Sequence, residues 1–350
     1  MHFCRSVLDV HEYRPPLQGR STTDELLLDF NERTDPLPPV VLEALAGWCL
    51  GGRTQVYPEY NGFLEALSSY TGLPEDHLFF GVGSDQLIDC VFRAVTDPGD
   101  VALIPAPSFA MYAHSAALAQ ADTRTFDMMA SDLAGVARER LAERRVRIAV
   151  FGQPNNPTGG MIPSQVLLEL VRDNPETWFL VDEAYAEFSG DSLLPLVSRQ
   201  FPQNLVVART FSKAFGLAAL RIGYVVASPA MVMQLAKIRG PYDLSSLASY
   251  AALVVLRHRD EVLSYATEVM SIYKPRVEAA LRSRKIAFLP SQANFLLIPG
   301  GVALLADHLK SHGIRTRVMG QPELTGALRI SIGGAEATRR LLDALSTPLS

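Results

Sequence analysis

Cysteine is scarce in this sequence. The 350 residues include only three, Cys4, Cys49 and Cys90, and no two of them form a CxxC pair. An odd number of scattered cysteines indicates neither a disulfide framework nor a zinc site. We therefore expect a protein of a reducing compartment, and we predict that it is cytoplasmic.

Excess basic charge and long apolar runs are lacking as well. The net charge is -5, whereas a protein that neutralises nucleic-acid phosphates needs a basic face. No apolar run reaches the roughly 18 residues of a membrane span. The N-terminal stretch MHFCRSVLDVHEYRPP holds no uninterrupted apolar segment of the kind found in a signal peptide. We predict no nucleic-acid partner and no membrane partner.

Three common catalytic signatures are missing or incomplete. His308 and His312 have the spacing of a zinc-binding pair, but HLKSH lacks the glutamate of HExxH, so a solvated helix face is the better interpretation. No GxSxG elbow is present. The stretch GVGSDQ resembles a dinucleotide fingerprint, yet Gln86 stands where the third glycine belongs. We therefore predict neither a metal site nor an NAD site.

A regular alternation of apolar and amphipathic segments extends to residue 240. The apolar runs have strand length, and a parallel sheet covered on both faces requires such strands. The expected strands are 77–81, 101–105, 146–152, 178–182, 205–208 and 222–227. Two of the helices expected between them are 62–70 and 84–94, with Ser84 as the expected N-cap of the second.

The pattern changes after Gly240 and Pro241, a pair that often breaks regular structure. Residues 245–284 have a mostly helical pattern, and shorter strand and helix candidates alternate after them. The sequence predicts an α/β fold with a large, doubly wound, mostly parallel sheet domain at 36–240 and a small α+β domain at 241–350. Residues 1–35 are predicted to pack on the small domain.

Lys213 lies directly after an expected strand, in the stretch TFSKAFGLAALR. A solvated surface is the usual place for a lysine, but the apolar run that follows Lys213 disfavours it here. A desolvated lysine has a lowered pKa, which suits a nucleophile that forms a Schiff base. Arg221, together with the hydroxyl groups of Thr210 and Ser212, is expected to hold a phosphate group.

Other polar and aromatic residues also follow expected strands. Asp182 ends one of them and Tyr185 comes soon after, whereas Asn156 lies in GQPNNPTG. Taken singly, such residues are ordinary turn formers. Phe109 is as well suited to core packing as to stacking on a ring. Backbone amides at a helix start bind phosphate, which makes the stretch Gly83-Ser84-Asp85 a candidate phosphate site.

These candidates together meet the demands of pyridoxal phosphate (PLP). Lys213 supplies the Schiff base, Asp182 the partner of the pyridine nitrogen, Tyr185 and Asn156 the donors to the ring oxygen, and Phe109 the stacking ring. Ligands of open α/β sheets bind at the C-terminal ends of the strands, where most of these residues are expected. We predict PLP as the cofactor, with Lys213, Asp182 and Tyr185 as the catalytic residues.

The sequence resembles fold-type I PLP enzymes, the aspartate aminotransferase superfamily, and within it most closely the histidinol-phosphate aminotransferases. The matching stretches occur in the family's order over nearly the whole chain. They are Asn31-Glu32, YPEYNG at 57–62, GSD at 83–85, PSFAMY at 107–112, PNNPTG at 154–159, VDEAY at 181–185, SKAF at 212–215, LRIG at 220–223, Pro241-Tyr242, ANF at 293–295 and LRI at 328–330.

The resemblance implies further roles. Tyr57 is implied to reach the cofactor phosphate of a neighbouring subunit, which would make a homodimer with shared active sites the functional form. Arg329 is implied to hold the acidic group of the substrate, with Arg317, Tyr13 and Asn31 as further substrate-binding residues. A buried arginine also needs an anion on physical grounds.

The chain departs from the family pattern at a few positions. Where an asparagine and a proline usually follow Asn31-Glu32, this chain has Arg33 and Thr34, and Gln86 stands where a glutamate is common. Arg33 lies near the expected substrate entrance. It either points inward as an additional cation or points outward as a surface charge, which is the usual state of an arginine in a proline-rich loop.

The resemblance implies an aminotransferase that moves an amino group from L-histidinol phosphate, or a similar donor, to 2-oxoglutarate. One alternative is a lyase of the threonine-phosphate decarboxylase type, but such lyases tend to have threonine at the position of Ser212 and phenylalanine at that of Tyr185. Another is an aminotransferase for a different amino acid in a specialised pathway. A PLP-fold regulator would need a DNA-binding domain, for which 350 residues leave no room beside this fold.

Overall fold

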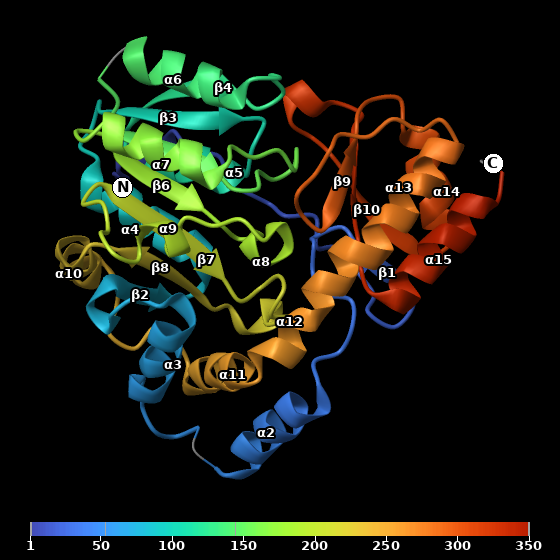
Figure 1. The fold of residues 1–350 in the computed structure, drawn as a ribbon, viewed down its shortest axis with the longest axis horizontal. Coiled ribbons are helices and arrows are strands. Elements are labelled where there is room, and N and C mark those ends of the chain that lie inside the picture. Colours follow the sequence, from blue (N-terminus) through green and yellow to red (C-terminus); the bar gives the residue numbers. More distant parts are fainter. Residues whose placement is uncertain (1, 53, 144, 349–350) are drawn as a thin grey trace.

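The computed structural model describes residues 2–52, 54–143 and 145–348. It contains two β-sheets, one of seven strands and one of four. Helices cover both sheets, and the smaller sheet lies to one side of the larger one (Figure 1). Among the described residues no helix is long and apolar enough to cross a membrane.

The large sheet has the strand order β2-β8-β7-β6-β5-β3-β4. Only β8 runs against its neighbours, so the sheet is mostly parallel, as the sequence predicts. Its strands are β2 (Leu78–Gly81), β3 (Val101–Ala106), β4 (Asp122–Asp127), β5 (Ile148–Gly152), β6 (Trp178–Asp182), β7 (Leu205–Thr210) and β8 (Gly223–Ala227). All but β4 coincide with expected strands to within two residues.

Helices pack on both faces of this sheet and bury its apolar side chains in two separate cores. The helices that contribute to one core include α3 (Asn61–Thr71), α6 (Leu133–Glu143), α7 (Ser164–Asp173) and α9 (Leu194–Val197). Those of the other are α4 (Gly83–Val95), α5 (Ala110–Leu118) and α10 (Pro229–Ile238). Coverage of both faces explains why the central strands are continuously apolar.

The start of α4 differs from the sequence prediction. The helix begins at Gly83 with Val82 at the N-cap, and no side chain caps it, so the assignment of Ser84 as N-cap is wrong. Instead, the side-chain oxygen of Gln86 accepts a hydrogen bond of 2.8 Å from the Val82 amide. Gln86 therefore stabilises this turn from within the helix, which leaves the Ser84 hydroxyl available for other partners.

The small sheet has the order β1-β10-β11-β9. Its strands are β1 (Leu26–Leu28), β9 (Phe295–Ile298), β10 (Ile314–Val318) and β11 (Leu328–Ser331), and α13 (Lys274–Ser283), α14 (Ala303–Ser311) and α15 (Ala335–Ser346) pack against it. Because β1 pairs with β10, the N-terminal part of the chain belongs to this sheet. The expected solvated face on α14 is wrong for His308, which is buried and contacts the Ala344 carbonyl at 3.0 Å.

A series of helices connects the two sheets after residue 240. It runs from α11 (Ser246–Arg257) through α12 (Arg259–Glu268) and a π-helical segment (Val269–Tyr273) into α13, as Figure 1 shows. The helix α11 packs on α2 (Pro39–Leu50) and α3 and contributes to a core of the large sheet. The division of the chain at residue 240 remains a prediction.

Two further short helices, α1 (Arg5–Leu8) and α8 (Ala186–Ser189), complete the α-helices of the described residues. Beside α8 lies a largely buried charge network. Arg209 of β7 donates to Glu183 at 2.9 Å and to Glu187 at 2.9 Å, and Tyr70 donates to Glu187 at 3.1 Å. Arg209 also reaches the Ser192 hydroxyl at 2.7 Å.

Replacing Arg209 with methionine tests how strongly the fold depends on this network. The variant leaves two buried carboxylates without their cation, so we expect the free energy of unfolding to fall by about 3–5 kcal/mol. Arg124→Met, which removes the exposed ion pair with Asp122, should cost less than about 1 kcal/mol. Urea denaturation at neutral pH measures both, and equal losses would contradict the expectation.

Candidate active site

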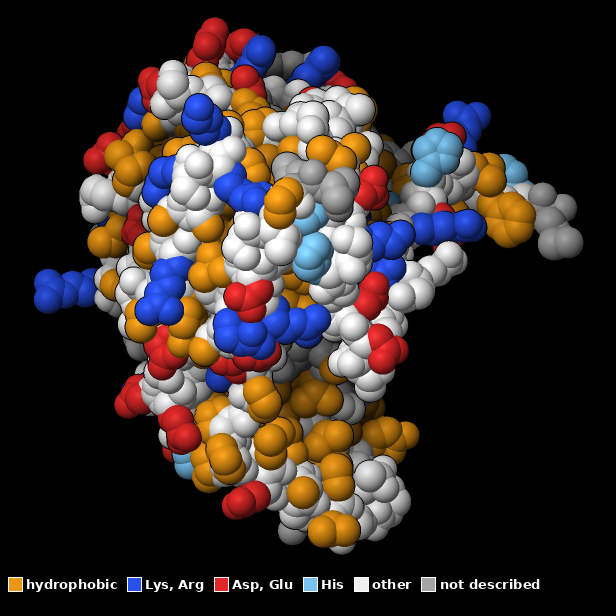
Figure 2. Space-filling model, turned by 90° about the vertical axis from the view of Figure 1, so that its right-hand side faces the viewer, with side chains coloured by type: hydrophobic (Ala, Val, Ile, Leu, Met, Phe, Trp, Pro, Cys, Tyr) orange, Lys and Arg blue, Asp and Glu red, His pale blue; other side chains and the backbone are white. Residues whose placement is uncertain are grey.

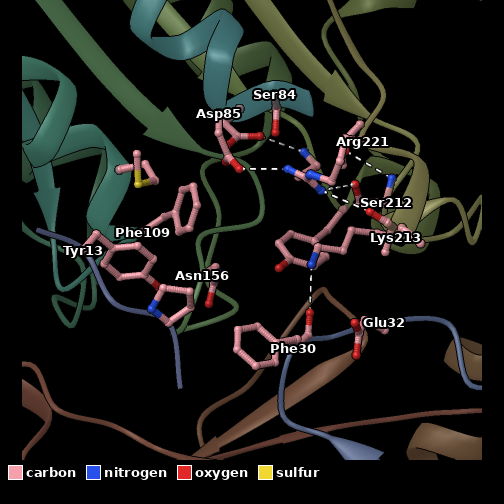
Figure 3. Close-up of a pocket in the computed structure, with 18 of the residues that line it drawn as sticks. Tyr13, Phe30, Glu32, Ser84, Asp85, Phe109, Asn156, Ser212, Lys213 and Arg221 are labelled. Carbon is pink, nitrogen blue, oxygen red and sulfur yellow. Dashed lines mark hydrogen bonds and ion pairs between the residues drawn. The ribbon is translucent and has the colours of Figure 1, made fainter. Parts of the chain in front are cut away.

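A cavity of about 650 Å³ lies at the C-terminal ends of the parallel strands of the large sheet (Figure 3). Many of the residues proposed from the sequence line this single cavity, although they come from distant parts of the chain. They are Tyr13, Ser84, Asp85, Phe109, Asn156, Asp182, Tyr185, Thr210, Ser212, Lys213 and Arg221. The convergence follows from the topology, because parallel strands present their C-terminal ends on one edge of the sheet.

Lys213 reaches into the cavity from the loop after β7. Its Nζ donates a hydrogen bond of 2.8 Å to the carbonyl oxygen of Phe30 and lies 5.9 Å from the centre of the Tyr185 ring. Burial lowers the pKa of Lys213 to about 8, and the positive charge of Arg329 acts in the same direction. A substantial fraction of this lysine is therefore neutral near pH 8, and only the neutral amine is a nucleophile and a base.

Asp182 occupies the end of β6 and is buried. One of its carboxylate oxygens accepts a 2.7 Å hydrogen bond from the Tyr112 hydroxyl, and the other accepts a 3.0 Å hydrogen bond from the Ala184 amide. Burial raises the pKa of Asp182 to about 6, although the Tyr112 hydrogen bond opposes this effect. The carboxylate is thus ionised at neutral pH at a cost, and a cation beside it would be stabilised.

Tyr185 and Asn156 supply further polar groups. The Tyr185 hydroxyl accepts a 2.9 Å hydrogen bond from the side-chain amide of Asn31, so its own hydrogen remains available as a donor. The side-chain oxygen of Asn156 accepts a hydrogen bond from Arg329, so the amide nitrogen is the group of Asn156 left to donate. Both side chains line the cavity.

The turn before α4 and the loop before β8 form a cationic, hydroxyl-rich end of the cavity. Arg221 donates to the Ser212 hydroxyl at 3.3 Å and to Asp85 at 3.0 Å, as the dashed lines in Figure 3 show. Gly83 has φ +77°, and a Cβ there would lie only 2.7 Å from an Arg221 nitrogen. The start of a helix, two serine hydroxyls and a guanidinium make a donor set that fits a phosphate.

Two arginines from the small sheet lie next to the cavity, behind the lining residue Asn156. Arg317 of β10 and Arg329 of β11 are directly paired across the two strands. Arg329 is buried, and besides Asn156 it donates to the Asp29 carbonyl at 2.6 Å. Burial lowers the pKa of Arg329, and the charge of Arg317 adds to this effect. Within the described ranges neither arginine has a carboxylate at ion-pair distance, so the pair favours an anion.

Some predicted residues do not line the cavity itself. Gly83, Asn31, Arg317 and Arg329 lie behind its lining. Tyr57 is 77% exposed, and its ring lies 4.7 Å from that of Tyr242 in a different groove. Tyr57 is therefore not part of the cavity within the same chain.

Sequence reasoning gave no role to four residues that the structure places at the site. Tyr112 binds Asp182, the Phe30 carbonyl binds Lys213, and Arg20 and Glu32 line the cavity and form an ion pair with each other. Tyr112 follows Phe109 by one helical turn, which is a signal that could have found it. A backbone carbonyl carries no such signal, because every residue has one.

Comparison with known proteins identifies the family. The family described as aminotransferase class I and II matches residues 23–345. The chain belongs to this family. Its prediction as an aminotransferase of this superfamily is confirmed. Histidinol-phosphate aminotransferases are similar over most of the chain: the Roseiflexus castenholzii protein is 38% identical, with 91% of this chain and 88% of that protein covered.

Solved structures place this family member within the same fold. The histidinol-phosphate aminotransferase of Sinorhizobium meliloti, crystallised with pyridoxal-5'-phosphate, superposes with a TM-score of 0.87 at 25% identity, and 98% of this chain and 96% of that chain are covered. The L-threonine-O-3-phosphate decarboxylase of Porphyromonas gingivalis has a TM-score of 0.80 at 21% identity, with 92% and 98% covered. At that identity the likeness concerns the fold alone.

The raised pKa of Asp182 predicts a stability effect that is independent of turnover. In protein freed of small ligands, Asp182→Asn removes a charge that is costly to bury. Because the folded pKa of about 6 lies above the ordinary value of 3.8, the variant should be more stable than wild type at pH 8 by up to about 3 kcal/mol. The difference should shrink as the pH falls through 6 and vanish below about 4.

Denaturant titrations of both proteins at pH 8, 6 and 4 measure this difference. A constant difference across the three values would show that Asp182 is not the group responsible. Tyr112→Phe is the matched variant in the opposite direction, since it removes the hydroxyl that stabilises the Asp182 carboxylate. It should be less stable than wild type at pH 8.

Proposed function

We propose that this chain binds PLP and moves the amino group of L-histidinol phosphate to 2-oxoglutarate. The proposal rests on the position of a lysine–aspartate pair directly beside a pair of arginines. A lysine with a lowered pKa shares a cavity with a buried aspartate. Next to them lies a pair of arginines that has no carboxylate partner among the described residues.

The residues of the cavity fit the cofactor. Ser84, Ser212 and Arg221 would hold its phosphate, and the requirement for glycine at position 83 is consistent with a tightly built cup. Asp182 would face the pyridine nitrogen. Tyr185 and Asn156 have the free donors that a ring oxygen needs. When bound, PLP supplies an electron sink for negative charge on the substrate's α-carbon.

Protein groups carry the remaining tasks. Lys213 Nζ is the attachment point and then the base that moves the α-proton, because its pKa of about 8 lies close to neutrality. Asp182 keeps a positive charge on the group opposite it through its buried carboxylate. Asp182 is buried and Lys213 is half-buried, and this removal from water strengthens the electrostatic interactions of both groups.

The arginine pair is the basis for the substrates. Histidinol phosphate carries a phosphate and 2-oxoglutarate a distal carboxylate, and both must occupy the same place in alternate half-reactions. Guanidinium groups bind both kinds of anion through paired hydrogen bonds. Arg317 and Arg329 lie side by side in the small sheet. The similarity to enzymes named histidinol-phosphate aminotransferase supports the same donor.

We also propose that the active form is a cytoplasmic homodimer. Exposed apolar side chains gather on and around α2, including Leu42, Leu50, Val56, Tyr57 and Tyr242. Figure 2 shows hydrophobic side chains at the lower end of the molecule, where Figure 1 places α2. Such a patch is typical of a protein–protein interface, and it includes the tyrosine implied to act on the neighbouring subunit.

The substrate is tested by comparing donors. We expect kcat/KM for L-histidinol phosphate to exceed that for phenylalanine and for L-histidinol by about 100-fold, since a donor without the phosphate leaves the buried Arg329 and the half-buried Arg317 without an anion. Arg329→Met should remove most of this preference. Release of CO2 from threonine phosphate, or a preference for a donor without phosphate, would overturn the assignment while leaving the PLP proposal intact.

The shared site is tested by mixing inactive subunits. Lys213→Ala and Tyr57→Phe each impair one part of a site. If Tyr57 acts on the partner, a heterodimer has one site with both lesions and one with neither, so activity should rise above that of both parents. Proven subunit exchange without any recovery would contradict the proposal. Mixing Lys213→Ala with Asp182→Asn is the control. Both residues lie in the cavity of one chain, so each site of that heterodimer keeps one lesion and no intact site forms.

A further inference from the structure

Arg33 is one of the two residues at which the chain departs from the pattern of its family directly after Asn31-Glu32. The structure turns it inward, where backbone carbonyls surround its guanidinium. It donates to the carbonyl of Val262 at 2.7 Å, that of Ala214 at 3.3 Å and that of Asp35 at 3.1 Å. Its Cζ lies 4.3 Å from the centre of the Tyr265 ring.

These contacts join three separate segments. Arg33 belongs to the loop between β1 and α2, Ala214 immediately follows Lys213, and Val262 and Tyr265 belong to α12. The helix α12 is part of the connection between the two sheets (Figure 1). Arg33 therefore links three parts of the chain through one side chain. They are the N-terminal segment, the loop at 211–217 that contains Lys213 (the lysine loop) and the connecting helix α12.

The lysine loop is shaped to admit this side chain. Gly216 has φ +73°, and a Cβ on it would lie 2.7 Å from Cδ of Arg33 and 3.1 Å from Leu37. A side chain at position 216 would thus push Arg33 out of its place. The two residues form a matched pair, one long and one without a side chain.

The arginine has no acidic partner here. Among the described residues no carboxylate lies within ion-pair distance of Arg33, and burial lowers the pKa of its guanidinium. A partly buried cation held only by carbonyls and an aromatic ring gains little from its charge. Its planar guanidinium, however, bonds three carbonyls in fixed directions, whereas a lysine ammonium is a point charge without this rigid fork.

The segment that Arg33 anchors also touches the groups of the cavity. The carbonyl of Phe30 accepts the Lys213 hydrogen bond, and Asn31 donates to the Tyr185 hydroxyl. In the same segment, the Thr34 amide donates to the Tyr265 hydroxyl at 3.2 Å. Lys213 is thus constrained from two sides, by its chain neighbour Ala214 and by its hydrogen-bond partner at Phe30. Arg33 fixes both.

We propose that Arg33 is a positioning residue, which sets the place of Lys213 in the cavity by clamping the lysine loop and the segment 30–34 to α12. The inference rests on the proposed role of Lys213. Arg33 touches no lining atom that reacts, and it acts through the backbone on either side of Lys213. Arg33, although it departs from the family pattern, thus belongs to the structure that supports the active site.

The test uses the PLP-loaded enzyme with Arg33→Met and Arg33→Lys. Lys274→Met is the matched control, because Lys274 is a buried cation that also donates to backbone carbonyls, those of Ser291 and Ala293, in the small domain. We measure kcat and KM with the best donor of the panel above. Visible circular dichroism of the bound cofactor reports how the lysine holds it, and thermal melting reports stability.

We expect Arg33→Met to lower kcat by about 10- to 100-fold, the scale of misplacing a reacting group. The donor KM should change by less than about threefold, because the anion site is untouched. The visible dichroic band should weaken, and Arg33→Lys should show the same changes to a smaller degree. Lys274→Met should lower the melting temperature while keeping the band and kcat.

Two results would overturn the inference: wild-type kcat and dichroism in both Arg33 variants, or an equal loss in Lys274→Met. If Arg33→Met does not fold, Arg33→Lys decides alone, because it keeps the charge and most of the stem. A wild-type enzyme that shows neither a cofactor band nor transamination would instead refute the proposed function. The two failures are therefore distinguishable.

Discussion

A parallel sheet with helices on both faces can hold polar groups only where its strands end. The strands β5 and β7 are buried along their whole length and β6 is buried except at Trp178, and an unpaired charge in their interior would cost several kcal/mol. Their C-terminal ends lie on one edge. Asn156, Asp182 and Lys213 therefore meet there, each within a few residues of the strand that precedes it.

The same edge concentrates charge that the protein does not neutralise internally. Asp182 is buried and has a raised pKa, whereas the buried Arg329 and the half-buried Lys213 have lowered pKa values. Each shift is a cost to folding that a bound ligand of the opposite charge would offset. Away from the cavity, by contrast, Arg209 has two carboxylate partners. The difference separates a structural ion network from a binding site.

The sequence predicted the central strands and most of the cavity lining because both leave local signals. A strand buried on both faces is a continuous apolar run, and the polar residues of interest follow such runs directly. The strand β4 escaped prediction because it lies at the edge of the sheet and reads DTRTFD, mostly exposed. Ser84 was misjudged because the side chain of Gln86, within the first turn of the helix, bonds the Val82 amide in place of a cap. His308 was misjudged because its burial depends on α15, which is distant in sequence.

By itself the sequence determined the α/β class, the strands that deliver Lys213 and Asp182, and the residue types that suit PLP, since these follow from hydrophobic periodicity and local motifs. Only the tertiary structure decided which groups touch. Phe30 meets Lys213 across 183 positions, and Arg329 meets Asn156 across 173. The orientation of Arg33 is of the same kind. Its charge alone indicates solvent, but the carbonyls of Ala214 and Val262 and the space left by Gly216 hold it inside. Such contacts arise from the packing of two sheets against one connecting segment, which no local pattern encodes.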